Sequence, residues 1–561
     1  MKILAGTRRW LRWIAPERGA LGRDLAAGLP GSVTAVPEGM AHGLLAGVSP
    51  VHGLYAGVFG PIGGGLTVST RMMAITTTTA AALAAGSAVE SVPEQDRPRA
   101  LFLLTVLAGG VMVVAGVMKL GRYTRFVPHS VMIGFLSGVS ANIICGQLAL
   151  LAGAKVSGPI ALARAWDLIT HPGRIDLGAL VTGLSALGLM AALKRTRLAT
   201  YSTLIALVVP ALVVSALPAG AVPLVRDGVE IPSGLPMPAL PRLSDLSFSL
   251  VSGAFAVAAV ILVQGAGIRE SAPNRDKARS DPNQDFVAQG VGSLLAGLFR
   301  GMPVGGSTGR TALNISAGAA GRWATIFSGL WMAVVLLLFS DLLGSVVVST
   351  LSAVLIFAAV GSFRVADIRA IMRTGHISQI AVLSTFVGTL FLPIAAAVGV
   401  GLVVSLLMQL NQEALDLRVV ELLPQVDGSF LEQPAAPHLE SHRVVVLDVY
   451  GSLFYAGART LQAQLPDPAP TRQPAVVLRL RGRVTLGATA FLVLCDYAER
   501  LTAVGGRLFV SGIEPALLEQ ARKNRTLENV RGVELFPAGE VVGESTIVAY
   551  RAAQRWLSAL E

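Results

Sequence analysis

Long apolar segments, broken by short polar stretches, fill the first 410 residues of the chain. A membrane-spanning helix needs about 20 apolar residues to cross a hydrocarbon core about 30 Å thick. About fourteen segments are candidates, and several are too short to span alone. They are 25–46, 51–66, 72–89, 100–120, 126–152, 177–193, 199–217, 248–268, 286–299, 308–319, 323–343, 345–360, 377–393 and 395–410. The pattern predicts an α-helical polytopic membrane domain over 25–411.

The pattern changes after Gln412. Residues 412–442 are polar and contain proline, so we interpret them as a linker. From 443 to 561 short apolar runs alternate with amphipathic segments, which predicts a small mixed sheet covered by helices. The expected strands are 443–449, 475–482, 505–512 and 533–538, and the expected helices are 488–504, 515–523 and 544–557.

Composition excludes several classes of protein. Hydrophobic residues make up 53% of the chain and charged residues only 14%, against about 25% charged in soluble proteins. Two cysteines make a thiolate metal centre unlikely to form. The motifs H-E-x-x-H and G-x-S-x-G and a P-loop are missing from the sequence. We therefore expect no metal, no cofactor and no enzymatic activity.

The net charge of +11 has a topological explanation. The basic residues cluster between apolar segments, which the positive-inside rule explains better than nucleic-acid binding does. The clusters expected on the cytoplasmic side are 119–125, 194–197, 269–279 and 364–373, whereas the mostly acidic loop VESVPEQDRP is expected outside. Residues 1–24 are a basic leader. We expect a multi-pass protein of the plasma (inner) membrane with the leader and the 443–561 domain in the cytoplasm.

One internal repeat points to the functional site. Residues 57–71 are GVFGPIGGGLTVSTR and residues 297–310 are GLFRGMPVGGSTGR. Both contain Gly-x-Phe, a proline, a glycine cluster, Ser-Thr and then arginine. Seven segments separate the start of one half from the start of the next, so the two halves should be inverted in the membrane, a plan common among secondary transporters.

Glycine and proline clusters interrupt helices, and irregular backbone at membrane depth persists only where it lines a cavity or is buried in protein. Each half should therefore contain a short helix that begins part-way through the bilayer. The first should begin near Ile75 and open with Thr76, Thr77 and Thr78, and the second near Ser307 and Thr308. Helix N-termini favour anions. Two that face each other would make an anion site.

Several polar residues near the predicted anion site have two possible interpretations each. The threonines could instead hydrogen-bond to their own backbone. Arg310 either supplies positive charge to the site or pairs with a carboxylate. Glu38 and His42 share a helical face and could line the cavity and take part in proton coupling, or His42 could be a packed, hydrogen-bonded histidine. Gly306 could form a backbone anion nest or serve close helix packing.

Two long motifs resemble a known family. The segments PEGMAHGLLAGVSPVHGLYAG (37–57) and DPNQDFVAQGVGSLLAGLFRGMPVGGSTGRTALNISAGA (281–319) resemble the sulfate permease (SulP) family. The C-terminal part resembles the sulfate transporter and anti-sigma factor antagonist (STAS) domain. The resemblance implies fourteen spans in a seven-plus-seven inverted repeat, a core domain that moves against a gate domain, and a homodimer.

The resemblance also implies a set of site residues. The anion should lie between the two half helices, with Glu38, His42 and Arg310 lining the cavity. The half-helix positions are Thr76, Thr77, Thr78, Gly306, Ser307, Thr308 and Gly309. Many relatives have an acid in the eighth span for cation coupling, and the matching position here is the neutral Gln264. This departure favours proton symport or anion exchange over sodium coupling.

The expected function is secondary active transport of a small inorganic anion by alternating access. Sulfate is the first expectation and bicarbonate the second, with chloride also open. The alternatives are an anion exchanger or channel of the same fold, or a sensor that acts through the STAS domain. The expected partners are the anion, H⁺ as co-substrate, the lipid bilayer and a second copy of the chain.

Overall fold

The computed structural model describes residues 14–16, 19–216, 218, 222–228, 234–272, 274, 279–425, 429–524 and 530–560. Most of the expected leader, 1–13 and 17–18, lies outside the described residues. The chain divides into two compact units, Met1–Ser405 and Leu406–Glu561. Each unit is described by itself.

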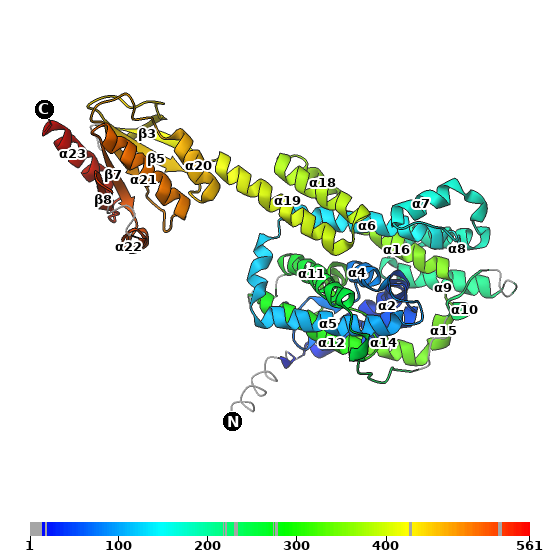
Figure 1. Ribbon diagram of the computed structural model, residues 1–561. Helices are drawn as coiled ribbons and strands as arrows, with labels where there is room; N and C mark the ends of the chain where they lie inside the picture. The colour runs from blue at the N-terminus through cyan, green and yellow to red at the C-terminus, as the bar shows by residue number, and fades with distance from the viewer. Residues whose placement is uncertain are drawn as a thin grey trace. The chain divides into compact units, whose positions relative to one another are not determined.

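The first unit is helical (Figure 1). Its helices are α2 (Leu21–Leu45), α3 (Pro50–Gly65), α4 (Thr79–Val89), α5 (Arg97–Val117), α6 (His129–Leu151), α7 (Ala161–Thr170), α8 (Leu177–Leu193), α9 (Ser202–Ser215), α10 (Val225–Gly228), α11 (Phe248–Ser271), α12 (Pro282–Leu298), α13 (Thr308–Ser316), α14 (Trp323–Leu338), α15 (Ser340–Gly344), α16 (Val348–Ser362), α17 (Val365–Ile371), α18 (His376–Phe391) and α19 (Ile394–Leu415). Helix α19 continues past the boundary between the units.

Length and apolar composition alone qualify four segments of the described chain to cross a membrane. They are Arg97–Val117, His129–Leu151, Phe248–Arg269 and Val348–Ile371. Other apolar helices are shorter, as the repeat of interrupted segments leads one to expect. The expected number of fourteen spans stays a prediction.

The helices of the first unit pack in two groups. The first helix group contains α2, α3, α4, α5, α11, α12, α13 and α14, and the second contains α6, α7, α8, α9, α16, α17 and α18. Glycines allow the closest approaches: a Cβ on Gly109 of α5 would lie 2.8 Å from the Gly290 carbonyl oxygen of α12. Such small-residue contacts drive helix packing where apolar surface alone does not.

The second unit is built on one sheet with strand order β4-β3-β5-β6-β7-β8. Strands β5 to β8 are parallel, and β3 runs antiparallel to both β4 and β5. The strands are β3 (Arg418–Pro424), β4 (Phe430–Pro434), β5 (Val444–Tyr450), β6 (Ala475–Arg479), β7 (Arg507–Ile513) and β8 (Val533–Pro537). Helices cover both faces, so the central strands are nearly continuous apolar runs.

Four helices provide that cover: α20 (Tyr455–Gln464), α21 (Ala488–Ala503), α22 (Pro515–Asn524) and α23 (Glu544–Ser558). Leu461 of α20, Phe491 of α21 and Leu517 of α22 belong to the core on one face. Ala549 and Ala553 of α23 belong to the core on the other. The four strands and three helices expected in 443–561 are all present, and α20 was missed.

The linker expected at 412–442 was wrong for most of its length. Helix α19 extends to Leu415, and β3 and β4 are paired strands of the sheet. The reason is a buried charge: Glu421 in β3 is 3% exposed and forms an ion pair with Arg443 at 2.9 Å. An acidic residue inside a short apolar run makes that run resemble a polar linker in the sequence. The residue that pairs with the acid lies elsewhere in the chain, so the sequence pattern does not reveal that the acid is buried.

Candidate functional site

The two interrupted segments of the repeat meet as a pair of short strands. Strand β1 (Ala74–Thr76) pairs antiparallel with β2 (Gly305–Ser307). The register pairs Ala74 with Ser307, Ile75 with Gly306 and Thr76 with Gly305. Each strand leads into a short helix, β1 into α4 and β2 into α13. Because the strands are antiparallel, the two helices leave this crossing in opposite directions.

A hydroxyl caps each short helix. Thr78 is the N-cap of α4 and its Oγ1 accepts from the Ala81 N–H at 3.3 Å. Ser307 is the N-cap of α13 and its Oγ accepts from the Arg310 N–H at 3.4 Å. The predicted start of α13 is confirmed. The predicted start of α4 near Ile75 was wrong, because Thr76 belongs to β1 and the helix begins at Thr79.

The polar groups at the start of α4 are already hydrogen-bonded inside the protein. His42 of α2 is 3% exposed, and its Nδ1 lies 3.0 Å from Thr77 Oγ1 while its Nε2 lies 3.2 Å from Thr79 Oγ1. The interpretation of His42 as a packed, hydrogen-bonded histidine is therefore confirmed. Thr78 Oγ1 also donates to Gln264 Oε1 on α11 at 3.2 Å. These contacts fix α4 against α2 and α11.

Arg310 of α13 forms a buried ion pair across the repeat. Its Nη2 and Nε donate to Glu38 Oε2 of α2 at 2.8 and 3.2 Å, and its Nη1 donates to the Gly31 carbonyl oxygen. The carboxylate neutralises the guanidinium charge. Of the two interpretations of Arg310, pairing with a carboxylate is therefore the one that the structure shows. A buried charge requires such a partner. The pair positions α13 and brings no net charge to an anion.

Gly306 does not offer a free N–H. Its N–H donates to Gln289 Oε1 of α12 at 3.0 Å. A Cβ at Gly306 would lie 2.9 Å from Ile268 Cδ1, and a Cβ at Gly305 would lie 2.7 Å from Ile261 Cγ2. These glycines let β2 pass close to α11, so packing, rather than the expected anion nest, explains Gly306.

The opening of α13 faces a cavity of about 240 Å³ that we call the α6–α11 cavity. Thr308 and Gln264 both line it, and Thr308 and Gly309 are exposed. Its remaining lining residues are His129, Met132, Ile133, Phe135 and Leu136 of α6, Val263 and Gly267 of α11, and Arg364. The first and second helix groups both contribute to its wall.

The α6–α11 cavity has the chemistry to hold a small anion. Thr308 and Gln264 are neutral hydrogen-bond donors, the start of α13 adds its partial positive charge, and Arg364 adds a full one. His129 and Arg364 were missed by the sequence analysis. Arg364 belongs to a basic cluster that was assigned only to topology, His129 lies inside an apolar segment, and no local motif marks either as a cavity residue.

Of the other predicted site residues, Ser307 and Gly309 flank Thr308 and Thr78 is bonded to Gln264, whereas the rest do not line this cavity. Thr76 and Arg310 line a separate space of about 10 Å³, about the volume that one water needs. Thr77 and His42 are bonded to each other, Glu38 to Arg310, and Gly306 to Gln289. Within the described part of the chain no cluster of three or more His, Cys, Asp or Glu residues could hold a metal ion.

Comparisons with known proteins identify the family of this chain. The model of the sulfate permease family matches residues 21–387. A probable sulfate transporter of Mycobacterium tuberculosis is 25% identical over 542 residues, 94% of each chain. The bicarbonate transporter BicA of a Picosynechococcus strain is 27% identical over 322 residues, 56% of each chain.

Solved structures share the fold. Murine Slc26a9, an anion transporter in the inward-facing state, is 18% identical with a TM-score of 0.83, over 97% of this chain and 94% of that chain. The transmembrane domain of a cyanobacterial BicA is 20% identical with a TM-score of 0.59, over 70% and 98%. The first unit has a helical membrane-transporter fold, and all these proteins are transporters, not enzymes. The chain belongs to the sulfate permease family of anion transporters.

Proposed function

We propose that this chain is a secondary active transporter that carries sulfate across the plasma membrane and binds it in the α6–α11 cavity. The observation that carries the proposal is the meeting of the two short helices. Thr308 opens α13 directly into the cavity, and Thr78 caps α4 while holding Gln264 at the same cavity. The curated relatives include sulfate transporters, which favours sulfate as the substrate.

The proposed binding residues divide into two sets. Ser307, Thr308, Gly309 and Gln264 contact the anion, with Arg364 supplying long-range attraction. A second set supports them: Thr76, Thr77, Thr78, Gly306, Glu38, His42 and Arg310 fix the strand crossing and both short helices. Neutral donors suit a carrier, because an anion held only by fixed full charges would leave slowly.

Alternating access fits the position of the cavity. The first helix group, with α4 and α13, acts as the core domain, and the second group, with α6, acts as the gate domain. The cavity has walls from both groups, so sliding one past the other would expose the anion to opposite sides. We further propose fourteen spans in an inverted repeat, a homodimer, and a cytoplasmic leader at 1–24.

The second unit is proposed to be a cytoplasmic STAS domain. Its parallel strands β5 to β8 with helices on both faces are compatible with the resemblance of residues 443–561. Strands β3 and β4 extend that domain toward the membrane domain in sequence. The domain is expected to affect regulation or folding more than anion choice.

Net uptake requires coupling to a second gradient, because binding alone shifts no equilibrium across the membrane. Gln264 carries no charge and presents only an amide, so it attracts Na⁺ less strongly than a carboxylate at this position would. Glu38 is bonded to Arg310. Proton symport or anion exchange is therefore proposed over sodium coupling.

Bicarbonate is the second candidate substrate. It is favoured by the 27% identity to the bicarbonate transporter BicA. A tracer panel of sulfate, bicarbonate and chloride in proteoliposomes, with and without pH and sodium gradients, separates these substrates and the coupling modes. Counterflow separates carrier from channel, since only a carrier speeds tracer uptake when it is loaded with unlabelled anion.

The site itself is tested by filling the cavity. Thr308→Trp should abolish uptake while the protein keeps its melting temperature. Leu330→Trp, at a position 46% exposed on α14, is the control of equal bulk. Uptake by Thr308→Trp at the rate of Leu330→Trp would reject the α6–α11 cavity as the binding site.

A further inference from the structure

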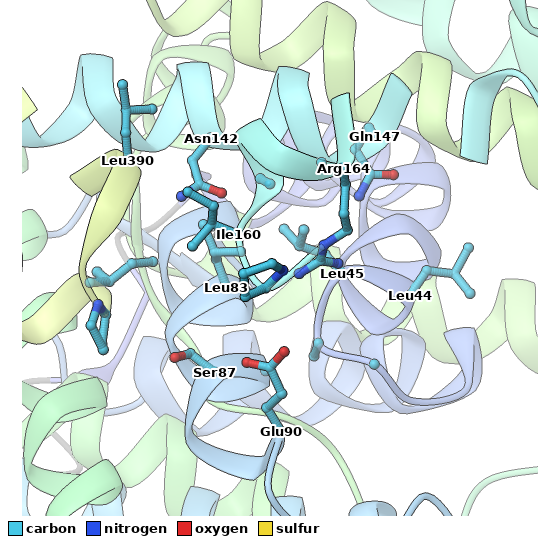
Figure 2. Close-up of a pocket in the computed structure, with 18 of the residues that line it drawn as sticks. Leu44, Leu45, Leu83, Ser87, Glu90, Asn142, Gln147, Ile160, Arg164 and Leu390 are labelled. Carbon is cyan, nitrogen blue, oxygen red and sulfur yellow. The ribbon is translucent and has the colours of Figure 1, made fainter. Parts of the chain in front are cut away.

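A second cavity of about 390 Å³ lies at the other end of α4. We call it the α4–α7 cavity. Figure 2 shows side chains from several helices pointing into it. Its polar lining residues are Ser87 of α4, Glu90 directly after α4, Arg97 of α5, Asn142 and Gln147 of α6, and Arg164 of α7. The end of α2 and the segment between α18 and α19 complete the wall.

The two cavities share one helix, α6, in their walls. Helix α6 lines the α6–α11 cavity up to Leu136 and the α4–α7 cavity from Asn142 onward. This separation is about 9 Å along the helix axis at 1.5 Å per residue. Buried Val139 lies between them in the main core. The two cavities therefore lie one after the other along α6, and buried apolar side chains of the core separate them.

Arg164 extends from α7 into the α4–α7 cavity (Figure 2). Its Nε is buried, and no hydrogen-bond partner for it exists among the described residues. The acid nearest in sequence does not neutralise it, because Asp167 pairs with Arg174 at 3.1 Å and with His171 at 3.0 Å. A buried guanidinium N–H without a hydrogen-bond partner is unfavourable unless a ligand accepts a hydrogen bond from it.

The remaining polar groups make the cavity a weak anion site. Two arginines and one carboxylate give the lining a net charge of +1. Arg97 is already held by the carbonyl oxygens of Val92 and Glu90, at 3.1 and 3.3 Å, so Arg164 is the arginine available to a ligand. Gln147 is 4% exposed and faces the same space. Glu90 would repel an anion and speed its release.

We propose that the α4–α7 cavity is a second anion-binding site, where a small inorganic oxyanion binds Arg164 on its way to or from the α6–α11 cavity. A planar guanidinium matches the oxygens of an oxyanion. The inference rests on the proposed transport function. Since the loop after α4 is the acidic loop expected outside, this site serves the external solution.

The test is sided transport kinetics in the full-length protein. Sulfate uptake and efflux are measured in right-side-out vesicles for the wild type, Arg164→Gln, Arg164→Lys and Arg174→Gln. Arg174 belongs to the same loop region, is 48% exposed and pairs with Asp167, so it is the matched control for charge. Arg164→Gln should raise the external KM about tenfold, the effect of one charge-assisted hydrogen bond. Its kcat for uptake should stay unchanged, and kcat/KM for efflux should fall by the same factor as kcat/KM for uptake, because one substitution cannot alter the equilibrium across the membrane.

The variants Arg164→Lys and Glu90→Gln test whether the effect on the external KM comes from charge at this cavity. Arg164→Lys should recover most of the external affinity, and Glu90→Gln should lower the external KM because it removes the repelling charge. An unchanged external KM in Arg164→Gln, or an equal rise in Arg174→Gln, would overturn the proposal. A fall in kcat with unchanged KM would assign Arg164 a structural role and overturn it as well. Failure of the wild type to transport any anion would instead reject the proposed function.

Discussion

The two short helices begin in the same way and differ in what their polar groups do. Both α4 and α13 follow a strand of the β1–β2 pair, and a hydroxyl caps each. At α4 the groups are buried and bonded: Thr77 contacts His42, and Thr78 contacts Gln264. At α13, Thr308 and Gly309 are exposed. The two halves of the repeat therefore share backbone geometry, while one half holds the crossing and the other opens to the α6–α11 cavity.

The largest expected effect is on the pair that holds α13. Arg310→Met removes the buried guanidinium, leaves the partly buried Glu38 (30% exposed) without its partner, and should destabilise the protein by about 2–3 kcal/mol. Thermal unfolding in detergent measures the loss. The double variant with Glu38→Met should recover much of it, because no charge then stays unpaired. A single variant as stable as the wild type would contradict the buried pair.

A carboxylate at the α6–α11 cavity should act mainly on anion binding. Gln264→Glu places a negative charge beside the start of α13 and should weaken sulfate binding by roughly tenfold or more near neutral pH. Calorimetry on purified protein measures the change. Gln379→Glu, at a partly exposed position on α18, controls for the added charge. If the two variants bind sulfate with equal affinity, Gln264 does not contact the bound anion.

Thr77 and Thr308 test the difference between the halves directly. Thr77→Val removes a hydrogen bond to His42 and should cost about 1–2 kcal/mol of stability with little change in sulfate KM. Thr308→Val should leave the stability nearly unchanged and raise the sulfate KM. Unfolding and uptake are measured on both variants. A rise in KM for Thr77→Val equal to that for Thr308→Val would show that both helices contact the anion.

The smallest effects belong to the two caps. Thr78→Ala and Ser307→Ala each remove a side-chain cap and should cost about 1 kcal/mol. Thr78→Ala should also release Gln264 and alter anion affinity slightly. Hydrogen exchange of the first turn of α4 and of α13 reports each loss. Protection unchanged in both helices would contradict the assigned caps.

Sequence patterns predicted the features that depend on local chemistry. Glycine and proline at matching positions predicted the two interruptions, and Ser307 and Thr308 were placed at the start of a helix. The tertiary contacts of these residues could not be predicted from such patterns. That Gln289 takes the Gly306 N–H, or that Arg364 reaches the same cavity as Thr308, depends on residues distant in sequence. The strand β3 was missed for the same reason, since its buried Glu421 is bonded to Arg443 and Gln433, which come later in the sequence.

The most direct test of the account is the position of the bound anion. A structure determined with selenate, a sulfate analogue whose selenium scatters anomalously, would locate it. The account predicts a selenium peak in the α6–α11 cavity, within hydrogen-bond distance of the Thr308 hydroxyl and the Gln264 amide. A peak confined to the small space beside Thr76 and Arg310, or found only outside both cavities, would contradict it.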